Sequence, residues 1–192
     1  LADDLGYGEL GSYGQEHFNT PNIDALAEEG IRFTSFYAGN AVCAPSRASL
    51  ITGRHPGHSS VRGNFSVVDG KRRRVGLQKS DVTTGELFKK AGYRTASIGK
   101  WHLFSSSLKD STTSFPQYRG FDVSLRERFD SVAYSYYDIV SRKKDIKRYP
   151  GFPFVMWENG NKIFYEDNFS GKSLYVDDIL NERGIDFIKE GR

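Results

Sequence analysis

The chain has 192 residues and a mass of 21.7 kDa, which suits one domain, because single domains commonly hold about 100–200 residues. Apolar residues make up 38% and charged residues 27%, with 14 Phe, 11 Tyr and 2 Trp, so the composition excludes a globally disordered chain. No apolar run approaches the roughly 18 residues that cross a bilayer, and Leu1–Gly8 lacks the basic-then-apolar order of a signal peptide.

The net charge is +3 and the isoelectric point is near 8.9, a balance too mild to indicate nucleic-acid binding by itself. The one basic run, Lys71–Arg74, is typical of a solvated loop, with contact to a polyanion as the alternative. A single cysteine, Cys43, excludes an intramolecular disulfide. Its side chain is then inert buried filler, a metal ligand or a reactive group.

In the first part of the chain, Leu1–Ala2 resembles the end of a strand that runs into a glycine-rich loop. The sequence Asn19–Thr20–Pro21, followed by apolar residues at helical spacing and by Gly30, predicts a helix that ends at this glycine. The next segment, Ile31–Tyr37, is β-branched and aromatic and predicts a strand.

Two further helices are indicated by their ends. One begins near Cys43 and stops at Gly53, and the other opens at the Thr83/Glu86 capping-box spacing and stops at Gly92. A strand over Tyr93–Ile98 follows. The alternation of helices and strands predicts an α/β fold with a largely parallel sheet.

The later part of the chain offers weaker signals. Ser105–Ser114 has no apolar periodicity and predicts a loop, and the polar, basic Arg142–Gly151 predicts a surface excursion. Leu174–Lys189 carries apolar residues on one face and predicts a final helix, interrupted by Gly184. No internal repeat and no convincing linker divides the chain, so we expect residues 1–192 to belong to a single domain.

Three small groups of residues could carry chemistry. Asp3 and Asp4 lie where a predicted strand gives way to a loop, and two neighbouring carboxylates form either a turn or a site for a hard divalent cation. Cys43 lies at a predicted helix N-terminus, where the helix dipole favours an anion, with Arg47 one turn later; the alternative is an inert buried cysteine.

The third group is Lys100 and His102. In an extended backbone these side chains point the same way, about 6.5 Å apart, while Trp101 packs behind them. A cation and an imidazole on one face suit an anionic substrate with a leaving group that needs a proton. A surface strand end is the alternative.

The sequence motifs that contain these three groups resemble motifs of the sulfatase family. Ala41–Arg54, with its Cys-x-Pro-Ser-Arg core, is similar to the first sulfatase signature, and Gly92–His102 is similar to the second. The opening Asp3–Gly8 and the stretch Asn19–Asp24 resemble the segments that follow the family's first strand. Several motifs in the family's order, over about the first hundred residues, are more specific than any one of them alone.

The resemblance implies a chemistry for the single cysteine. Cys43 would be oxidised after translation to formylglycine, by a formylglycine-generating or anaerobic sulfatase-maturating enzyme that reads Pro45 and Arg47. The hydrated aldehyde would attack sulfur, with Arg47 holding the diol oxygen and with Lys100 and His102 holding sulfate and leaving-group oxygens. The activity implied is hydrolysis of a sulfate ester, of a small molecule or a glycan, to an alcohol and inorganic sulfate.

The resemblance also implies a cofactor and a fold. Asp3, Asp4 and the modified Cys43 would bind one divalent cation, commonly Ca²⁺ in this family, with Mg²⁺ as the alternative. The fold would be alkaline-phosphatase-like, α/β with a mostly parallel central sheet flanked by helices, incomplete here at both ends. Two departures from the family pattern are Phe104 after His102–Leu103, and a stretch without histidine at Ser131–Tyr137.

Family members are longer than this chain, and a hard cation takes about six or more oxygens. We therefore expect an N-terminal fragment, inactive alone, whose remaining ligands lie beyond Arg192. Alternatives are a phosphonate or phosphate monoesterase of the same superfamily, a non-catalytic sulfoglycan-binding relative, and a protein left unmodified. The family habit implies a periplasmic, secreted or lysosomal location. From the mild net charge and the lack of a long apolar run, we expect no nucleic-acid partner and no transmembrane segment.

Overall fold

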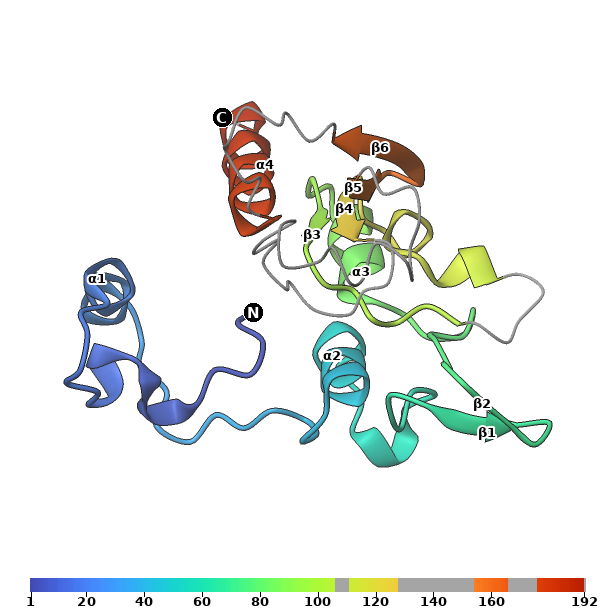
Figure 1. The fold of residues 1–192 in the computed structure, drawn as a ribbon, viewed down its shortest axis with the longest axis horizontal. Helices are drawn as coiled ribbons and strands as arrows, with labels where there is room; N and C mark the ends of the chain where they lie inside the picture. The colour runs from blue at the N-terminus through green and yellow to red at the C-terminus, as the bar shows by residue number, and fades with distance from the viewer. Residues whose placement is uncertain (106–110, 128–153, 166–175, 192) are drawn as a thin grey trace, which may run out of the picture. The chain divides into compact units, whose positions relative to one another are not determined.

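The computed structural model describes residues 1–105, 111–127, 154–165 and 176–191 (Figure 1). The segments expected as a surface excursion, Arg142–Gly151, and as a histidine-free stretch, Ser131–Tyr137, lie outside the described residues. The chain divides into two compact units, Leu1–Ala38 and Gly39–Arg192. Each is described by itself below.

The first unit is built around one α-helix. Its elements are η1 (Tyr7–Glu9), η2 (Gly11–Tyr13) and α1 (Pro21–Glu29). The predicted helix is confirmed, with Thr20 before it, Pro21 in its first turn and Gly30 at its end. The backbone N–H of Ser12 donates to Asp24 Oδ1 at 2.7 Å, and the N–H of Gly11 donates to Thr20 Oγ1 at 2.9 Å, so the first turn of α1 holds η2 in place.

Two strand predictions in this unit are wrong. Neither Leu1–Ala2 nor Ile31–Tyr37 is a strand. The second segment contacts η2 instead, because the Tyr13 hydroxyl donates to the carbonyl of Phe33 at 2.9 Å. A β-branched and aromatic composition favours a strand only when another strand is available to pair with it, and no described strand pairs with Ile31–Tyr37.

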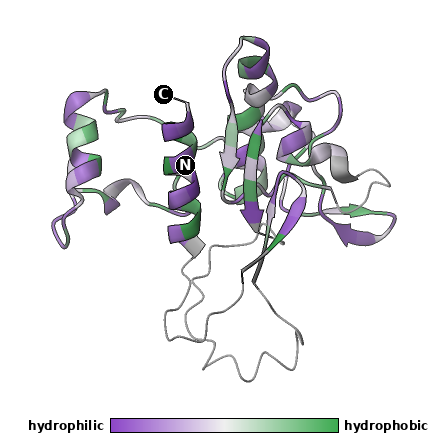
Figure 2. Ribbon diagram, turned by 90° about the horizontal axis from the view of Figure 1, so that it is seen from above, coloured by the Kyte–Doolittle hydropathy of each residue, from purple (hydrophilic) through white to green (hydrophobic). Residues whose placement is uncertain are grey.

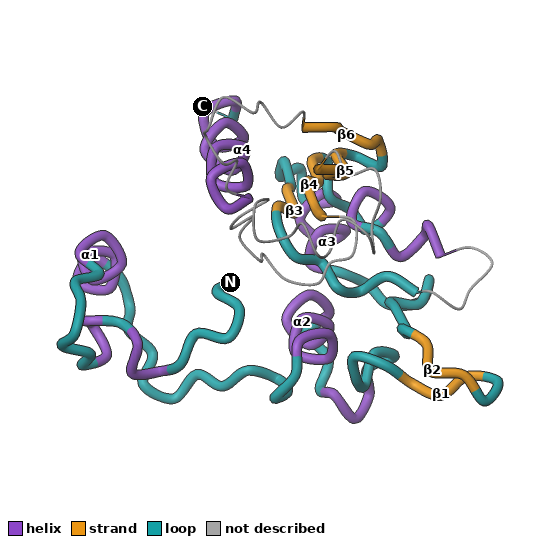
Figure 3. The backbone as a smooth tube through the Cα atoms, in the orientation of Figure 1, coloured by secondary structure: helices purple, strands orange, loops and turns teal. Residues whose placement is uncertain are grey.

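The second unit holds all the described strands (Figures 1 and 3). Its elements are α2 (Cys43–Thr52), η3 (Pro56–His58), β1 (Ser66–Val68), β2 (Lys71–Arg73), α3 (Thr84–Lys90), β3 (Ala96–Ile98), η4 (Ser111–Ser114), η5 (Pro116–Tyr118), β4 (Val123–Glu127), β5 (Phe154–Glu158), β6 (Asn161–Tyr165) and α4 (Val176–Glu190). The segment that we expected to be a loop, Ser105–Ser114, ends in the short 3-10 helix η4.

The main sheet is mixed. Its strand order is β3-β4-β5-β6, with β3 parallel to β4 and the other two pairs antiparallel. The expectation of a largely parallel sheet is therefore wrong for the described residues, because the tight turn between β5 and β6 forms an antiparallel hairpin. The strand predicted over Tyr93–Ile98 is confined to its last three residues.

The two helix starts predicted for the second unit are confirmed. Thr83 and Glu86 form the capping box of α3, and the Thr83 hydroxyl also donates to the carbonyl of Arg119 at 2.7 Å. α2 begins at Cys43 as expected and ends at Gly53, whose φ of 66° lies in the left-handed region that favours glycine.

The basic run Lys71–Arg74 is not a loop. Its first three residues form β2, which pairs antiparallel with β1 through a turn at Asp69–Gly70. Both turn residues have positive φ, 51° and 68°, as a two-residue hairpin turn requires. Charged and apolar residues do not alternate along β2. In the sequence, only the Asp-Gly pair at the turn indicated a hairpin here.

Helix α4 confirms the last predicted helix, and Gly184 does not interrupt it. Hydrophobic and hydrophilic residues alternate along it (Figure 2), and the half-buried Ile179, Leu180 and Phe187 mark the face that packs beside β3. Arg183 ties this face to the sheet through Glu158 at 2.8 Å. None of the helices in the described part of the chain has the length and apolar content that a membrane crossing needs.

One buried cluster joins α2 to the segment that follows β3. Its members are apolar and at most 3% exposed: Ala44, Ala48, Val61, Leu77, Trp101 and Leu103. Trp101 also donates from Nε1 to the carbonyl of Ser114 at 2.9 Å and packs edge-on against Phe121. This cluster fixes the start of α2 and the Lys100–Leu103 segment relative to each other.

We expect Trp101→Ala to lower the free energy of unfolding by about 3–5 kcal/mol, because it leaves a cavity in this cluster. Trp101→Phe keeps the ring contact with Phe121 and loses the Nε1 hydrogen bond, so it costs less, about 1–3 kcal/mol. Denaturant unfolding of both variants measures the difference. A loss below about 1 kcal/mol for the alanine variant would contradict the role given to the cluster.

A second prediction concerns the joint between β3 and β4. The Lys89 ammonium, 2.6 Å away, and the hydrogen bonds from Thr95 hold the pKa of Asp122 below its ordinary value. A lowered pKa stabilises the fold above about pH 4 and loses this effect as the pH falls through the folded-state pKa. We expect Asp122→Asn to cost about 1 kcal/mol at pH 7. The free energies of unfolding of the variant and wild type, measured by denaturant unfolding at several pH values, should converge towards about pH 2. A difference between them that is constant with pH would contradict the assignment.

Candidate active site

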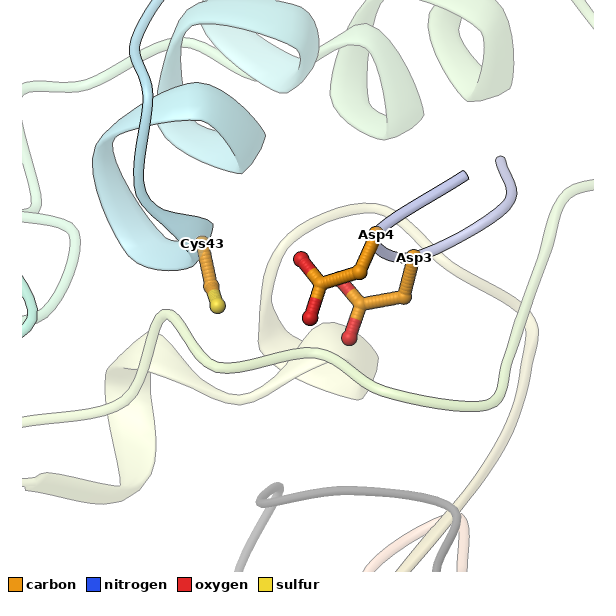
Figure 4. A group of neighbouring side chains, drawn as sticks. All are labelled: Asp3, Asp4 and Cys43. Carbon is orange, nitrogen blue, oxygen red and sulfur yellow. The ribbon is translucent and has the colours of Figure 1, made fainter. Parts of the chain in front are cut away.

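Cys43 is the first residue of α2 and is half-buried (Figure 4). The preceding residue, Val42, is extended and offers no side-chain cap to the helix. Instead Asn64 Oδ1, twenty residues along the chain, accepts a hydrogen bond from the N–H of Ala44 at 2.9 Å. Because Asn64 satisfies one of the free amides of the first turn, it stabilises the helix start that presents Cys43.

Lys100 faces the cysteine. Its Nζ lies 3.4 Å from Cys43 Sγ, within hydrogen-bonding distance of a sulfur atom. The guanidinium of Arg47, one turn along α2, donates to the backbone carbonyl of Lys100. The structure therefore brings Cys43, Arg47 and Lys100 together, with Arg47 holding the backbone from which Lys100 reaches the thiol.

The segment that carries Lys100 and His102 is not the extended strand that we expected. β3 ends at Ile98, Gly99 has φ 104° and His102 has φ 58°, so the backbone turns twice and the alternation of a strand does not apply. The packing expected for Trp101 is confirmed, since only 3% of it is exposed. His102, between Trp101 and Leu103, is itself 8% exposed.

Backbone contacts hold this segment at both ends. The N–H of Gly99 donates to the carbonyl of Leu125 on β4 at 2.8 Å, and the N–H of Leu77 donates to the carbonyl of Leu103 at 3.0 Å. A Cβ on Gly76 would lie 2.4 Å from that same Leu103 carbonyl oxygen, so only glycine allows the two backbones to approach so closely. The turns around His102 are thus fixed by the surrounding chain.

Asp3 and Asp4 belong to the first unit. Figure 4 shows their carboxylates side by side, and each offers an oxygen within 4.8 Å of the other. Two adjacent carboxylates supply the hard oxygen ligands that Ca²⁺ and Mg²⁺ prefer. The donor chemistry of this pair therefore fits the cation that we expected there.

Left-handed backbone marks two of the candidate residues. In the described part of the chain, four non-glycine residues have positive φ: Asp4, Asp69, His102 and Asn159. Asp69 and Asn159 each precede a glycine in a hairpin turn, where this conformation is required. Asp4 and His102 have no such turn, and strain of about 1–3 kcal/mol per residue is typical of functional sites.

The arrangement in the second unit suits an anion. The Lys100 ammonium lies beside Cys43 Sγ at the N-terminus of α2, and the Arg47 guanidinium lies against the Lys100 backbone carbonyl. Fixed positive charge stabilises negative charge that develops on a bound group. Sequence reasoning found Cys43, Arg47 and Lys100 but missed Asn64. An asparagine that caps a helix from twenty residues away leaves no local spacing signal.

The chain is similar to known sulfatases over most of its length. A family model described as Sulfatase matches residues 1–190. Arylsulfatase G of Rattus norvegicus is 34% identical over 205 aligned residues, which cover 99% of this chain and 36% of that protein. Arylsulfatase A of Bos taurus is 43% identical over 137 residues, covering 71% of this chain and 25% of that protein. The chain thus spans about a third or less of the length of these curated relatives.

Solved structures are similar as well. The crystal structure of Ps i-CgsB is 26% identical with a TM-score of 0.77, covering 100% of this chain and 40% of that chain. The structure of BT4656 in complex with its substrate D-glucosamine-2-N,6-O-disulfate is 28% identical with a TM-score of 0.67, covering 97% of this chain and 29% of that chain. The family model over residues 1–190 and these likenesses show that the chain belongs to the sulfatase family.

Proposed function

We propose that the whole protein hydrolyses a sulfate ester to an alcohol and inorganic sulfate, with a nucleophile made from Cys43. The observation that carries the proposal is the position of Lys100 Nζ, 3.4 Å from Sγ at the first residue of α2. A cation fixed beside the nucleophile stabilises the negative charge on a sulfuryl group under attack. The membership of the sulfatase family supports the same reaction.

The nucleophile proposed is formylglycine, in which the Cβ of Cys43 has become an aldehyde carbon. A separate maturation enzyme, which supplies the oxidant, makes this change. Water adds to the aldehyde and gives two hydroxyls on one carbon. The Sγ atom of the present side chain therefore stands in for a hydroxyl oxygen of the hydrate, and Lys100 Nζ lies where it can donate a hydrogen bond to that oxygen.

The reaction then runs in two steps. One hydroxyl oxygen, losing its proton, attacks sulfur, and the bond from sulfur to the ester oxygen breaks as the alcohol takes a proton. The second hydroxyl then loses its proton, the carbon–oxygen bond to the sulfate breaks, and sulfate leaves as the aldehyde forms again. Serine and cysteine have no second hydroxyl on the same carbon, so neither releases sulfate in this way.

Three side chains assist these steps in the proposal. Lys100 holds an oxygen of the sulfate, and His102 holds the leaving-group oxygen and gives it a proton. Arg47 contributes positive charge near the diol oxygen and holds the Lys100 backbone through its carbonyl. The strained backbone of His102, with φ 58°, is consistent with a side chain held in one orientation for such a task.

We also propose that Asp3, Asp4 and the modified residue 43 bind one divalent cation, Ca²⁺ or Mg²⁺. The support is the adjacent carboxylate pair and the family's use of a metal. A bound cation polarises sulfate and favours an ionised diol. The carboxylates of Asp3 and Asp4 contribute by holding it through hard oxygen atoms.

The proposed substrates are sulfated small molecules or sulfated glycans. This choice is supported by a similar structure, BT4656, whose substrate is a disulfated glucosamine. The proposed partner in maturation is a formylglycine-generating or anaerobic sulfatase-maturating enzyme. The proposed location is periplasmic, secreted or lysosomal, as is the habit of the family.

The modification of Cys43 is directly testable. We expect mass spectrometry of the peptide that contains Cys43, after expression with a maturation enzyme, to show a lighter mass, because an aldehyde replaces the thiol. Release of sulfate from an aryl sulfate should accompany this shift and be abolished in Cys43→Ala. An unshifted peptide from a competent host, or full activity in the alanine variant, would refute the proposed nucleophile.

A second test addresses Lys100. We expect Lys100→Ala to lower kcat on an aryl sulfate by about 100-fold, because one preorganised donor is lost from the charge that develops on the sulfate. The matched control is Lys90→Ala, which removes an exposed cation at the end of α3 and should leave kcat within about twofold. Equal effects of the two substitutions would show that Lys100 acts only through the overall charge.

A further inference from the structure

A groove of about 380 Å³ lies next to the start of α2, lined by Val42, Asn64, Phe65, Ser66, Val67 and Arg72. Val42 directly precedes Cys43, and Asn64 accepts the hydrogen bond from Ala44. The groove therefore adjoins the first turn of the helix that presents the proposed nucleophile. A group that is attached to a sulfate at Cys43 could extend into it.

The β1–β2 hairpin supplies three of the residues that line the groove, Ser66, Val67 and Arg72. Val67 pairs directly with Arg72 in this hairpin, and Phe65, two residues before Val67, continues the same face. The guanidinium of Arg72 lies over the Phe65 ring at 4.1 Å from its centroid. A guanidinium stacked on an aromatic ring is held in place while its N–H groups, which lie in the guanidinium plane, remain able to donate.

The charge on this hairpin is not balanced. Lys71, Arg72 and Arg73 are consecutive cations, and none of them forms an ion pair with a carboxylate of the described residues. These cations are neighbours along one strand, and like charges that are close together repel one another. A bound anion would relieve this repulsion, and Arg72 is the member of the run that lines the groove.

We infer that this groove binds the part of the substrate beside the sulfate that is hydrolysed, and that Arg72 selects substrates that carry a second anionic group there. The substrate class is then a sulfate ester whose alcohol bears a further sulfate or carboxylate, as in a multiply sulfated sugar. The planar fork of arginine matches either group through two parallel hydrogen bonds. The apolar surfaces of Phe65 and Val67 suit the carbon face of a sugar ring. This inference rests on the proposed function.

The test compares two probes that differ in one anion, glucosamine 6-sulfate and glucosamine 2-N,6-O-disulfate, in the whole mature protein. We expect wild type to prefer the disulfated sugar and Arg72→Ala to lower its kcat/KM by about tenfold, chiefly through KM, because Arg72 contacts the second anion and not the reacting sulfur. The kcat/KM of Arg72→Ala on the monosulfated sugar should stay within about twofold of the wild-type kcat/KM. Arg72→Lys should retain part of the preference, since the charge remains and the fork is lost.

The matched control is Lys79→Ala, which removes one exposed cation from the same unit outside the groove. It should leave both values within about twofold. Raising the ionic strength should reduce the preference of wild type for the disulfated sugar, because partly exposed charges are screened. A salt-independent preference would contradict a role for charge in the groove.

Other outcomes would overturn the inference. Equal losses on both sugars in Arg72→Ala would assign Arg72 a structural role, and no loss on either would remove it from the substrate site. Weaker binding of a nucleic acid in Arg72→Ala, with kcat/KM unchanged on both sugars, would assign the basic run to a different polyanion.

Failure of the proposed function is a separate result. It would appear as wild-type protein that releases sulfate from neither sugar although residue 43 is modified. In that event the binding of the two sugars, measured by calorimetry in wild type and Arg72→Ala, still decides the inference. Tighter binding of the disulfated sugar that depends on Arg72 supports the groove, and equal binding of both sugars overturns it.

Discussion

The candidate site depends on the packing of α2 against the segment that follows β3. Ala44 and Ala48 lie one turn apart on the buried face of α2, at 2% and 0% exposed, and they meet Trp101 and Leu103. Because alanine side chains are small, the backbone after β3 can approach the helix closely. Arg47, between the two alanines, then reaches the Lys100 carbonyl, and Lys100 reaches Cys43.

The same packing explains how a strained segment persists. His102 has a positive φ, and this backbone conformation is unfavourable for a residue that has a side chain. Burial of Trp101 and Leu103 on either side offsets this cost, since each removes a large apolar surface from water. Two hydrogen bonds, from Trp101 Nε1 to Ser114 and from Leu77 to the Leu103 carbonyl, add to the stabilisation. The orientation of His102 is thus determined by its neighbours.

The features that the sequence predicted correctly are those with local causes. The Thr83/Glu86 capping box, the proline that starts α1 and the glycine that ends α2 act within one or two helical turns, so their spacing along the chain was sufficient. The Cys-x-Pro-Ser-Arg core likewise places Cys43 and Arg47 on adjacent turns of one helix.

The features that could not be predicted from the sequence depend on partners far along the chain. Ile31–Tyr37 has the composition of a strand but no described strand to pair with, while Lys71–Arg73 has a poor composition and is paired with β1. Asn64 caps α2 from twenty residues away, and the backbone around His102 turns because of contacts with Leu77 and Leu125. Pairing and close approach of this kind are properties of the folded chain.

The positive groups near the start of α2 repel one another. Lys100 lies against the N-terminus of α2, which carries a partial positive charge, and Arg47 lies one turn further. Placing these groups together costs free energy through their mutual repulsion, and the hydrophobic cluster beneath them stabilises the arrangement. An anionic group that binds there converts this repulsion into attraction. The fold therefore holds positive groups in place for an anion before any ligand binds, and this preorganisation is what the proposed sulfuryl transfer requires.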